Sequence, residues 1–520
     1  MKQNRIWFVL AGLILGIGFN FLFVTDNPNL SITVWFVLAL TLGFGLAIGR
    51  GEKIPAVSWL VGVLTLVFAA YPAVRTEPMT RTIGIMLAFF GLVLLAGTLL
   101  KKEWVKFPLL DLIVNFFISI AAAIANPFAM LIKGKNTEGE NRGKGSKGAI
   151  GGFLRGVVIA VPILLVLTAL LASADMVFAQ RLKEVSDWLV PDNFEEFIFR
   201  LALILMVGYF TMGMLVHAVR AEGGVLNHEQ KPVEFKPFLG WIETVIVLAG
   251  VALLFGFFTL IQFQYLFGGE ANIHEAGYTY SQYAVKGFSE LILVAFLTLV
   301  IVLVLGRISK RANFTRETVY QVLIGLNLAF VLVMVASAWM RLQLYLQAYG
   351  FTRLRSYTLL LIPWVAALVL GTLLLEVRGQ GRKFAMLALV CLAGFGLTFG
   401  FFNIDGFVVE KNFERVALTH KLDTRYLNEL SADAIYPIWE GMQSVKLDTD
   451  TKQKLEIALA CKQGELKEQS TNWRQFNWSV WNAQDLLDMD LPGSYAKQNG
   501  HPAILLDGKV HDCYPVFLED

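Results

Sequence analysis

The sequence is poor in the residues that build metal centres and water-exposed surfaces. Among its 520 residues are three cysteines and six histidines, and charged residues make up only 16%. An average soluble domain carries roughly 25% charged residues, so the composition excludes a soluble globular protein and a disordered chain. No HExxH, CxxC, Walker lysine loop or GxSxG element occurs in the sequence. We therefore expect no metal site and no cofactor, and no familiar catalytic set is present.

Long apolar runs are what the sequence has in abundance. Hydrophobic residues make up 56% of the chain, and 40 of its residues are phenylalanine. A helix needs about 20 mainly apolar residues to cross the hydrocarbon core, and runs that do not alternate exclude a membrane β-barrel. We predict an all-α polytopic membrane protein with about eleven transmembrane helices. The predicted spans are 6–24, 31–49, 54–72, 82–100, 154–174, 196–219, 239–266, 288–306, 318–342, 357–376 and 384–402.

The stretch 107–132 is long enough to span the membrane but is unusually polar. It contains Asp111, Asn115, Asn126 and Pro127, and lysines flank it on both sides. Because positive charge favours the cytoplasmic side, both ends of the stretch are expected to stay in the cytoplasm. We predict an interfacial or re-entrant helix. The alternative, a twelfth span, would reverse the orientation of everything that follows.

The distribution of lysine and arginine predicts the topology and the domains. These residues gather in the segments that lie in the cytoplasm when the N-terminus is inside. We predict an N-terminal membrane region (1–150) with four spans, the interfacial helix and a basic cytoplasmic loop. A membrane core of seven spans (151–402) follows. The remainder (403–520) is predicted to be a small, mostly helical extracytoplasmic domain.

Two features of the C-terminal stretch support a folded domain. Trp473, Phe476, Val480, Ala483 and Leu487 recur at spacings of three and four, which predicts one apolar helical face. Trp478 and Trp481 lie off that stripe. They either pack the other side of a small core or rest at the membrane interface, where tryptophan is favoured. Cys461 and Cys513 can form a disulfide if the domain lies in an oxidising compartment.

Basic and aromatic residues gather at the predicted outer ends of the spans. Ser337, Arg341 and Tyr345 are spaced by four and share one helical face. Arg353 and Arg355 lie on the outer side, against the usual charge bias, which indicates that they have partners. One interpretation is a site for an anion or a lipid headgroup; the other, which we favour, is a cluster that docks the C-terminal domain. The candidate residues are Lys286, Glu290, Arg341, Tyr345, Arg353 and Arg355.

Polar residues inside the spans form a second set of candidates, because the bilayer makes them costly. These residues are Glu243, Gln262, Asn327 and Ser337. A proton or ion path through Glu243, Asn327 and Glu290 is one hypothesis. The other, which is simpler, is a set of separate hydrogen bonds between helices.

Short motifs occur in order along the chain, at 171–175, 265–269, 283–291, 341–357, 403–405, Asn412 with Arg415, 430–434 and 473–477. Together they resemble an uncharacterised bacterial family of multi-pass membrane proteins, domain of unknown function 4173, which is related to 4153. The resemblance covers about residues 150–490 and implies a bacterial cytoplasmic (inner) membrane protein. It implies no activity. The similar pattern often has arginine where this chain has Lys286, which weakens a bidentate contact there.

Three functions remain open. We favour a non-enzymatic interaction, regulatory or sensing component that displays its C-terminal domain outside the cytoplasm. A transporter or channel for a small solute or ion is the first alternative, although no inverted repeat is visible. A membrane enzyme acting on lipid-linked substrates is the second, although no general base is evident. The expected partners are the lipid bilayer and, on the outer face, an anionic lipid headgroup or a protein. A net charge of +3 gives no sign of nucleic-acid binding.

Overall fold

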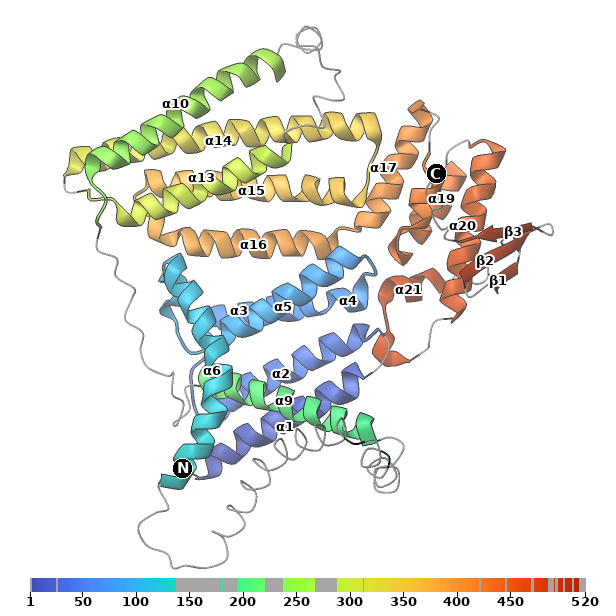
Figure 1. The fold of residues 1–520 in the computed structure, drawn as a ribbon, viewed down its shortest axis with the longest axis horizontal. Helices are drawn as coiled ribbons and strands as arrows, with labels where there is room; N and C mark the ends of the chain where they lie inside the picture. The colour runs from blue at the N-terminus through green and yellow to red at the C-terminus, as the bar shows by residue number, and fades with distance from the viewer. Residues whose placement is uncertain are drawn as a thin grey trace, which may run out of the picture. The chain divides into compact units, whose positions relative to one another are not determined.

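The fold was analysed in a computed structural model of the chain (Figure 1). The structure describes residues 2–24, 27–136, 175, 180, 194–219, 237–266, 288–311, 313–419, 422–444, 447–468, 472–484, 491, 494–498, 501–506 and 509–513. The predicted span at 154–174 and the candidate Lys286 lie outside these residues.

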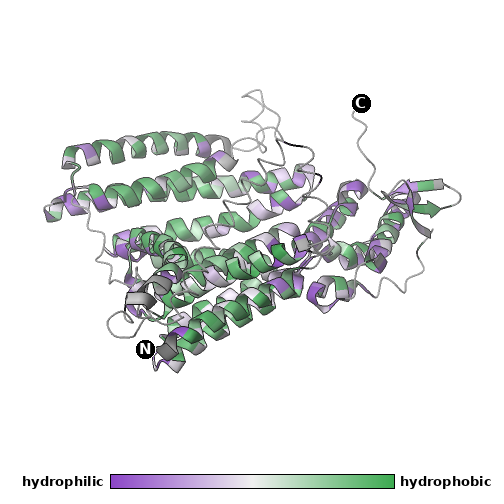
Figure 2. Ribbon diagram, turned by 60° about the horizontal axis from the view of Figure 1, so that its bottom comes forward, coloured by the Kyte–Doolittle hydropathy of each residue, from purple (hydrophilic) through white to green (hydrophobic). Residues whose placement is uncertain are grey.

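Long apolar helices make up the first three quarters of the described chain, and Figure 2 shows hydrophobic residues along most of their length. This confirms the prediction of an all-α polytopic membrane protein. The elements are α1 (Lys2–Phe23), α2 (Asn29–Gly49), α3 (Ala56–Ala69), α4 (Tyr71–Val74), α5 (Pro78–Thr98), the 3₁₀ turn η1 (Glu103–Lys106), α6 (Leu109–Asn136), α9 (Phe194–Ala218), α10 (Trp241–Leu266), α13 (Phe288–Ile308), α14 (Phe314–Tyr349), α15 (Arg353–Val377), η2 (Gly381–Lys383) and α16 (Phe384–Phe401).

Among the described residues, 11 helices are long and apolar enough to cross a membrane. Ten of them coincide with predicted spans, and the eleventh is the part of α6 from Leu109 to Ala129. Helix α6 is a single helix of 28 residues that continues through Pro127. A re-entrant segment would have to turn back within the membrane, so the unbroken helix argues against that form. An interfacial helix and a further span both stay compatible with its length and composition.

The described chain forms two compact units. The first comprises Met1–Val24, Leu42–Arg50 and Ile118–His228, and the second comprises Thr25–Thr41, Gly51–Phe117 and Glu229–Asp520.

In the first unit, α1 and α9 approach each other through glycines. A Cβ atom added at Gly12 would lie 2.7 Å from the carbonyl oxygen of Gly208, and one added at Gly16 would lie 2.2 Å from that of Ile204. No side chain fits between the two backbones at these positions. Small residues at a spacing of four are typical of helices that pack closely within a bilayer. Helix α9 also contacts α6, where Asn126 donates from Nδ2 to the carbonyl oxygen of Gly213 at 3.4 Å.

The core of the second unit is built on α14. Its buried face includes Tyr320, Ile324, Leu328 and Leu342, and it packs against residues of α10, α13 and α15. Because α14 is in contact with all three helices, its polar side chains are enclosed on most sides. The position of α14 therefore explains why its polar residues meet partners from other helices.

The C-terminal domain belongs to the second unit. Its elements are α17 (Ile404–Thr419), α18 (Thr424–Asn428), η3 (Ala432–Ala434), α19 (Ile435–Ser444), α20 (Thr449–Glu468), η4 (Trp473–Gln475), α21 (Trp478–Asn482), β1 (Ser494–Gln498), β2 (His501–Leu506) and β3 (Lys509–Asp512). Val408, Ile438 and Leu455 lie in its hydrophobic core, which also takes in Phe399 from the end of α16. The domain is mostly helical, as predicted. Its antiparallel sheet, with strand order β1-β2-β3, was not predicted.

The single apolar helix predicted over 473–487 is wrong. Two short turns stand in its place, because two asparagines begin new helical segments. Asn472 accepts a hydrogen bond from the backbone N–H of Arg474, and Asn477 accepts one from that of Val480. Between them Phe476 has an extended backbone (ψ 131°). Asparagine side chains favour caps and turns over helix interiors for this reason. Leu487 lies outside the described residues.

Candidate functional site

Arg353, one of the candidate ligand-binding residues, binds a carboxylate of the C-terminal domain. Its Nε and Nη2 atoms donate to Oδ1 and Oδ2 of Asp405 at 2.7 and 2.6 Å. Asp405 is completely buried and also accepts a hydrogen bond from the backbone N–H of Ser431 at 2.7 Å. Two parallel bonds between guanidinium and carboxylate combine strength with a fixed geometry. The first residue of α15 is thereby fastened to the second residue of α17.

The backbone of Arg353 is held as well. Its N–H donates to the hydroxyl oxygen of Tyr426 at 2.7 Å. Burial raises the pKa of the Tyr426 phenol above its ordinary value, so the phenol stays neutral at physiological pH. Helix α15 therefore starts on groups supplied by α17 and α18.

Asp433 makes a second connection between the C-terminal domain and the spans. Its Oδ2 accepts hydrogen bonds from the backbone N–H groups of Thr76 and Glu77, each at 2.8 Å, and from the hydroxyl of Thr76 at 3.0 Å. Its Oδ1 accepts one from the hydroxyl of Ser479, and Arg75 approaches the same oxygen at 3.8 Å. The carboxylate is fully enclosed by the segment that leads into α5.

Glu77 lies beside this carboxylate and caps α5. Its side chain accepts hydrogen bonds from the N–H groups of Met79 and Thr80 at 2.9 and 2.6 Å. The hydroxyl of Tyr357, from α15, donates to Oε1 of Glu77, the same oxygen that accepts from Met79. Negative charge is favoured at the N-terminus of a helix. We define the junction as Glu77, Arg353, Tyr357, Asp405 and Asp433, the polar residues at which α5, α15 and the C-terminal domain meet; the three carboxylates are buried, and Arg353 and Tyr357 are half-buried.

The turn between α14 and α15 is the third point of attachment. Asn412 accepts from the N–H of Phe351 at 3.0 Å and donates to its carbonyl oxygen at 2.8 Å. Arg415 donates to the carbonyl oxygen of Ala348 at 2.8 Å. Gly350 between them has φ 77°, and a Cβ atom there would lie 2.8 Å from Oδ1 of Asn412. The turn therefore requires glycine both for its conformation and for this close approach.

The other outer candidates are engaged locally. Arg355 donates to the carbonyl oxygens of Tyr349 and Gly350 at 3.0 and 2.7 Å and to the hydroxyl of Tyr345 at 3.0 Å. Its guanidinium carbon lies 4.2 Å from the centre of the Tyr345 ring. The structure thus brings Arg355 and Tyr345 together, while Arg353 takes part in the junction.

The buried polar residues of α14 meet α10. Arg341 and Ser337 both donate to Oε1 of Gln262, at 2.9 and 2.8 Å. Asn327 donates to the carbonyl oxygen of Leu248 at 3.0 Å. Gln262 and Leu248 both belong to α10, so these three contacts connect the same pair of helices.

Glu243 and Glu290 do not join this set. Both are exposed residues in the first turns of their helices, α10 and α13. The start of α10 meets the end of α13, where Thr244 donates to the hydroxyl oxygen of Ser309 at 2.9 Å. Glu243 and Glu290 consequently lie at opposite ends of this helix pair. Among the described residues, no cluster of three or more His, Cys, Asp or Glu could hold a metal ion.

Thr76, Glu77 and Asp433 were not predicted as partners in the junction. A local signal exists for Glu77, since an acidic residue directly before Pro78 is a typical helix start. Asp405 and Asp433 fall within motifs singled out above, 403–405 and 430–434. Their pairing with α15 and α5 joins residues 52 and 357 positions apart, which no local pattern indicates.

Removing the charge of Asp433 tests its role in the junction. Asp433→Asn should lower the free energy of unfolding by about 2 kcal/mol, because an amide nitrogen would replace one of the oxygens that now accept N–H and O–H groups. Thermal unfolding of the purified protein measures the effect. Glu414→Gln, which alters an exposed pair with Lys411, is the control and should change little. Equal effects of the two variants would contradict the buried role of Asp433.

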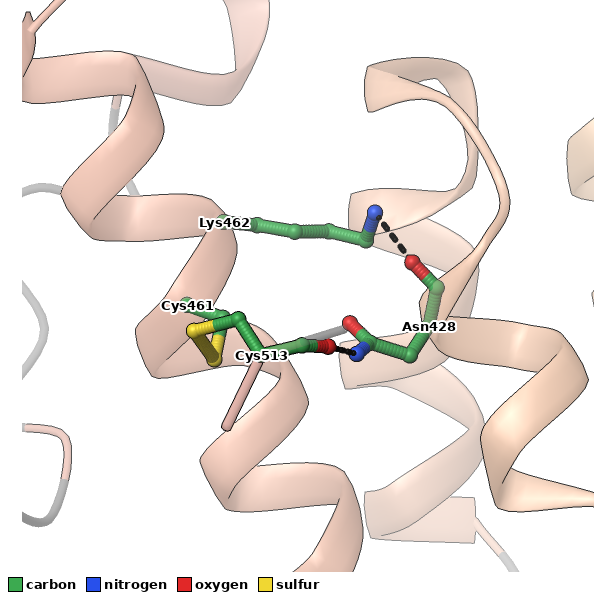
Figure 3. Close-up of a disulfide and its surroundings, with 4 residues drawn as sticks. All are labelled: Asn428, Cys461, Lys462 and Cys513. Atoms are coloured by element: carbon green, nitrogen blue, oxygen red, sulfur yellow. Dashed lines mark hydrogen bonds between the residues drawn. A yellow bond between two sulfur atoms is a disulfide. The ribbon is translucent and has the colours of Figure 1, made fainter. Parts of the chain in front are cut away.

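A disulfide and a buried lysine occupy the interior of the C-terminal domain (Figure 3). Cys461 of α20 is bonded to Cys513, which directly follows β3. The neighbouring Lys462 donates from Nζ to the carbonyl oxygens of Asn428 and Leu430 at 2.9 and 2.5 Å. Asn428 in turn donates from Nδ2 to the carbonyl oxygen of Cys513. Burial lowers the pKa of Lys462 to about 8, from an ordinary value of 10.5.

This lowered pKa gives stability a defined pH dependence. Between the folded and unfolded pKa values the unfolded chain binds more protons, so Lys462 makes the free energy of unfolding rise as pH increases from about 8 to about 10. The contribution amounts to about 1.4 kcal/mol per pH unit. Lys462→Met should lack this rise, whereas Lys467→Met, at an exposed position of the same helix, should keep it. Melting temperatures across this range measure the slope. The same slope in Lys462→Met and wild type would contradict the assignment.

Comparison with known proteins gives one match. The family described as "Domain of unknown function (DUF4153)" matches residues 61–440. The matched range contains all residues of the junction and ends before the disulfide and the aromatic residues of α21. No curated protein and no solved structure matches the chain.

Proposed function

Since the chain belongs to the DUF4153 family, a family of unknown function, we propose that this integral membrane protein is a non-enzymatic interaction component. In this proposal its spans serve as a platform for the C-terminal domain, which they present to a partner. We further propose, from the motifs described above, a kinship with the related family 4173 and a place in a bacterial cytoplasmic membrane.

One observation carries the proposal: Arg353, a candidate both for a ligand site and for docking of the C-terminal domain, is bound to the buried Asp405 of that domain. The remaining junction contacts fasten the same domain to α5. A domain held by buried charges in two places has a fixed position on its spans. Such rigid presentation suits recognition of a partner, because less conformational entropy is lost on binding.

The disulfide supports an extracytoplasmic position of the domain, because disulfides persist in oxidising compartments and are rare in the cytoplasm. If both α6 and the stretch 154–174 cross the membrane, twelve spans would place the domain in the cytoplasm instead. Alkylation of intact cells with a thiol-reactive polymer separates the cases. Because the polymer does not cross the membrane, the proposal requires Cys461 and Cys513 to be modified in intact cells once a reductant has opened the disulfide. Thiols that stay unmodified in intact cells after reduction, but react once the cells are permeabilised and the protein is denatured, would overturn the extracytoplasmic assignment.

Photocrosslinking in living cells tests the interaction. A photoreactive amino acid replaces Lys452, an exposed residue of α20, and, as a control, Ile246, an exposed apolar residue of α10. The proposal predicts a protein adduct of defined mass from position 452 and none from position 246. The adduct should weaken when Arg353→Met loosens the domain. Absence of adducts from position 452 and from further exposed positions of α20 would overturn the proposal.

A transporter or channel is the second candidate, and Arg341 is the observation that favours it. This residue is 7% exposed and lies near the end of the predicted span 318–342, and ionisable residues inside spans commonly mark solute or ion pathways. Arg341→Gln should abolish flux of a radiolabelled substrate into vesicles while leaving the melting temperature nearly unchanged. If Arg341 only joins α10 to α14, the variant would instead melt earlier and show no change in flux.

A further inference from the structure

Four aromatic residues of the C-terminal domain are exposed although they belong to a folded segment. The exposed fractions are 49% for Trp473, 37% for Phe476, 51% for Trp478 and 49% for Trp481. We call these four residues the aromatic patch. The same segment contributes Val480 and Ala483 to the hydrophobic core of the domain. The hydrophobic core of the domain is therefore filled without the tryptophans. Packing inside the domain does not explain why this segment carries them.

The segment that carries the patch is fixed to the ends of the spans. Asn477 donates from Nδ2 to the carbonyl oxygens of Pro72 and Arg75 at 2.9 and 3.0 Å. The hydroxyl of Ser479 shares its proton between the carboxylate of Asp433 and the carbonyl oxygen of Val74, the latter at 2.9 Å. These carbonyls belong to α4 and the residue after it, in the connection from α3 to α5. Figure 1 shows α21 beside this connection. On the other side, Asn29 at the start of α2 donates to the carbonyl oxygen of Gln475 at 3.0 Å.

The patch consequently lies level with the ends of α2, α3 and α5. Apolar exposed residues continue from it onto the spans, since Val74 is 37% exposed and Met79, in the first turn of α5, is 42% exposed. Arg75 lies at the same level and donates to the carbonyl oxygens of Gly400 and Phe401 at 3.4 Å. Aromatic and arginine residues at the ends of spans are typical of the boundary between hydrocarbon and water.

We propose that the aromatic patch is embedded in the headgroup region of the bilayer and anchors the C-terminal domain to the lipid surface. Tryptophan suits this region because its ring is apolar and its N–H can bond to water or to a headgroup. The rings of Trp478 and Trp481 are 4.9 Å apart and present a joint apolar surface. Lipid is the occupant that fits, because the patch continues the lipid-facing surface of the spans. The anchor goes beyond the proposed function and does not depend on which side of the membrane the domain occupies.

Spin-label accessibility in the full-length protein tests the proposal. In a Cys391→Ser background, Trp481→Cys is labelled with a nitroxide and the protein is reconstituted into nanodiscs of phosphatidylethanolamine and phosphatidylglycerol. Lys454→Cys, at an exposed position of α20, is the control. Collision with oxygen, which concentrates in the bilayer, is compared with collision with a water-soluble nickel chelate. The ratio of oxygen to nickel accessibility should be several-fold higher at position 481 than at position 454.

Two results would overturn the proposal. Equal ratios at positions 481 and 454 would place the patch in water. Low accessibility to both reagents at position 481 would show that protein, either a second copy or a partner, covers the patch. If Trp481→Cys does not fold, brominated lipids provide a test that needs no new cysteine. They should quench the wild-type fluorescence more strongly than that of Trp478→Phe/Trp481→Phe, and equal quenching of the two proteins would contradict the anchor.

Discussion

Replacing Arg353 with methionine should lower the free energy of unfolding by about 3 kcal/mol and loosen the C-terminal domain from the spans. The substitution leaves Asp405, which is completely buried, without its guanidinium partner. Breaking a buried ion pair from one side is strongly destabilising because the remaining charge has no compensation. Limited proteolysis should then release fragments of the C-terminal domain at protease concentrations that leave the wild type intact.

Two further variants distinguish loss of the ion pair from a general effect of substituting a residue at the start of α15. Arg353→Met/Asp405→Leu removes both charges and should recover most of the lost stability, since apolar groups can replace a buried pair at little cost. Arg355→Met, two residues away, removes contacts with local carbonyls and one tyrosine and should cost about 1 kcal/mol. A double variant as unstable as Arg353→Met would show that the pair is not the cause.

Gly16→Leu should destabilise the first compact unit by about 3 kcal/mol or more. Even a Cβ atom at this position would lie 2.2 Å from the carbonyl oxygen of Ile204, so α1 would have to move away from α9 along its length. Overpacking of this kind forces backbone shifts. Thermal unfolding in detergent measures the loss.

Gly45→Leu in α2 is the matched control for this glycine. Nothing lies within 4 Å of a Cβ atom added at Gly45, so the same substitution should be tolerated there. If both leucine variants melt at the same temperature, the close approach of α1 and α9 does not exist in the folded protein.

The spans could be predicted because the bilayer imposes one requirement on all of them. A helix must offer about 20 apolar residues whatever its neighbours are, and ten predicted spans correspond to described helices. The stretch 107–132 was harder to interpret because its polar residues have partners within the fold. Asn115 donates to the carbonyl oxygen of Gly97 and Asn126 to that of Gly213. Polar groups satisfied in this way are compatible with a span.

The candidate site was predictable only in part. Arginines on the outer side signalled that partners exist, because unpaired charge there contradicts the usual bias. The identity of each partner depends on which helices lie together. Arg353 meets α17, whereas Arg341 meets α10. Helices that are apolar all round give little indication of their neighbours, because lipid and protein suit their surfaces equally well.

The aromatic stripe of the C-terminal domain shows a different limit of prediction from sequence. Spacings of three and four predicted one helix, but Asn472 and Asn477 each form a cap and interrupt it. Local hydrogen bonds of the asparagine side chains compete with the helical periodicity. Asn477 inside the stripe, together with Asn472 directly before it, was the signal against a continuous helix.

The hydrogen bonds from Asn477 to Pro72 and from Ser479 to Val74 join positions 405 residues apart. At a synthesis rate of about 5 to 20 residues per second, roughly 20 to 80 s separate the appearance of these two positions on the ribosome. During that interval the connection from α3 to α5 is already made, while the groups that will bind its carbonyls do not yet exist. Water or a chaperone must occupy those carbonyls in the nascent protein. The connection from α3 to α5 therefore gains its partners among the last events of biogenesis. In a chain that stops before Asn477, the carbonyls of Pro72 and Val74 lack these partners.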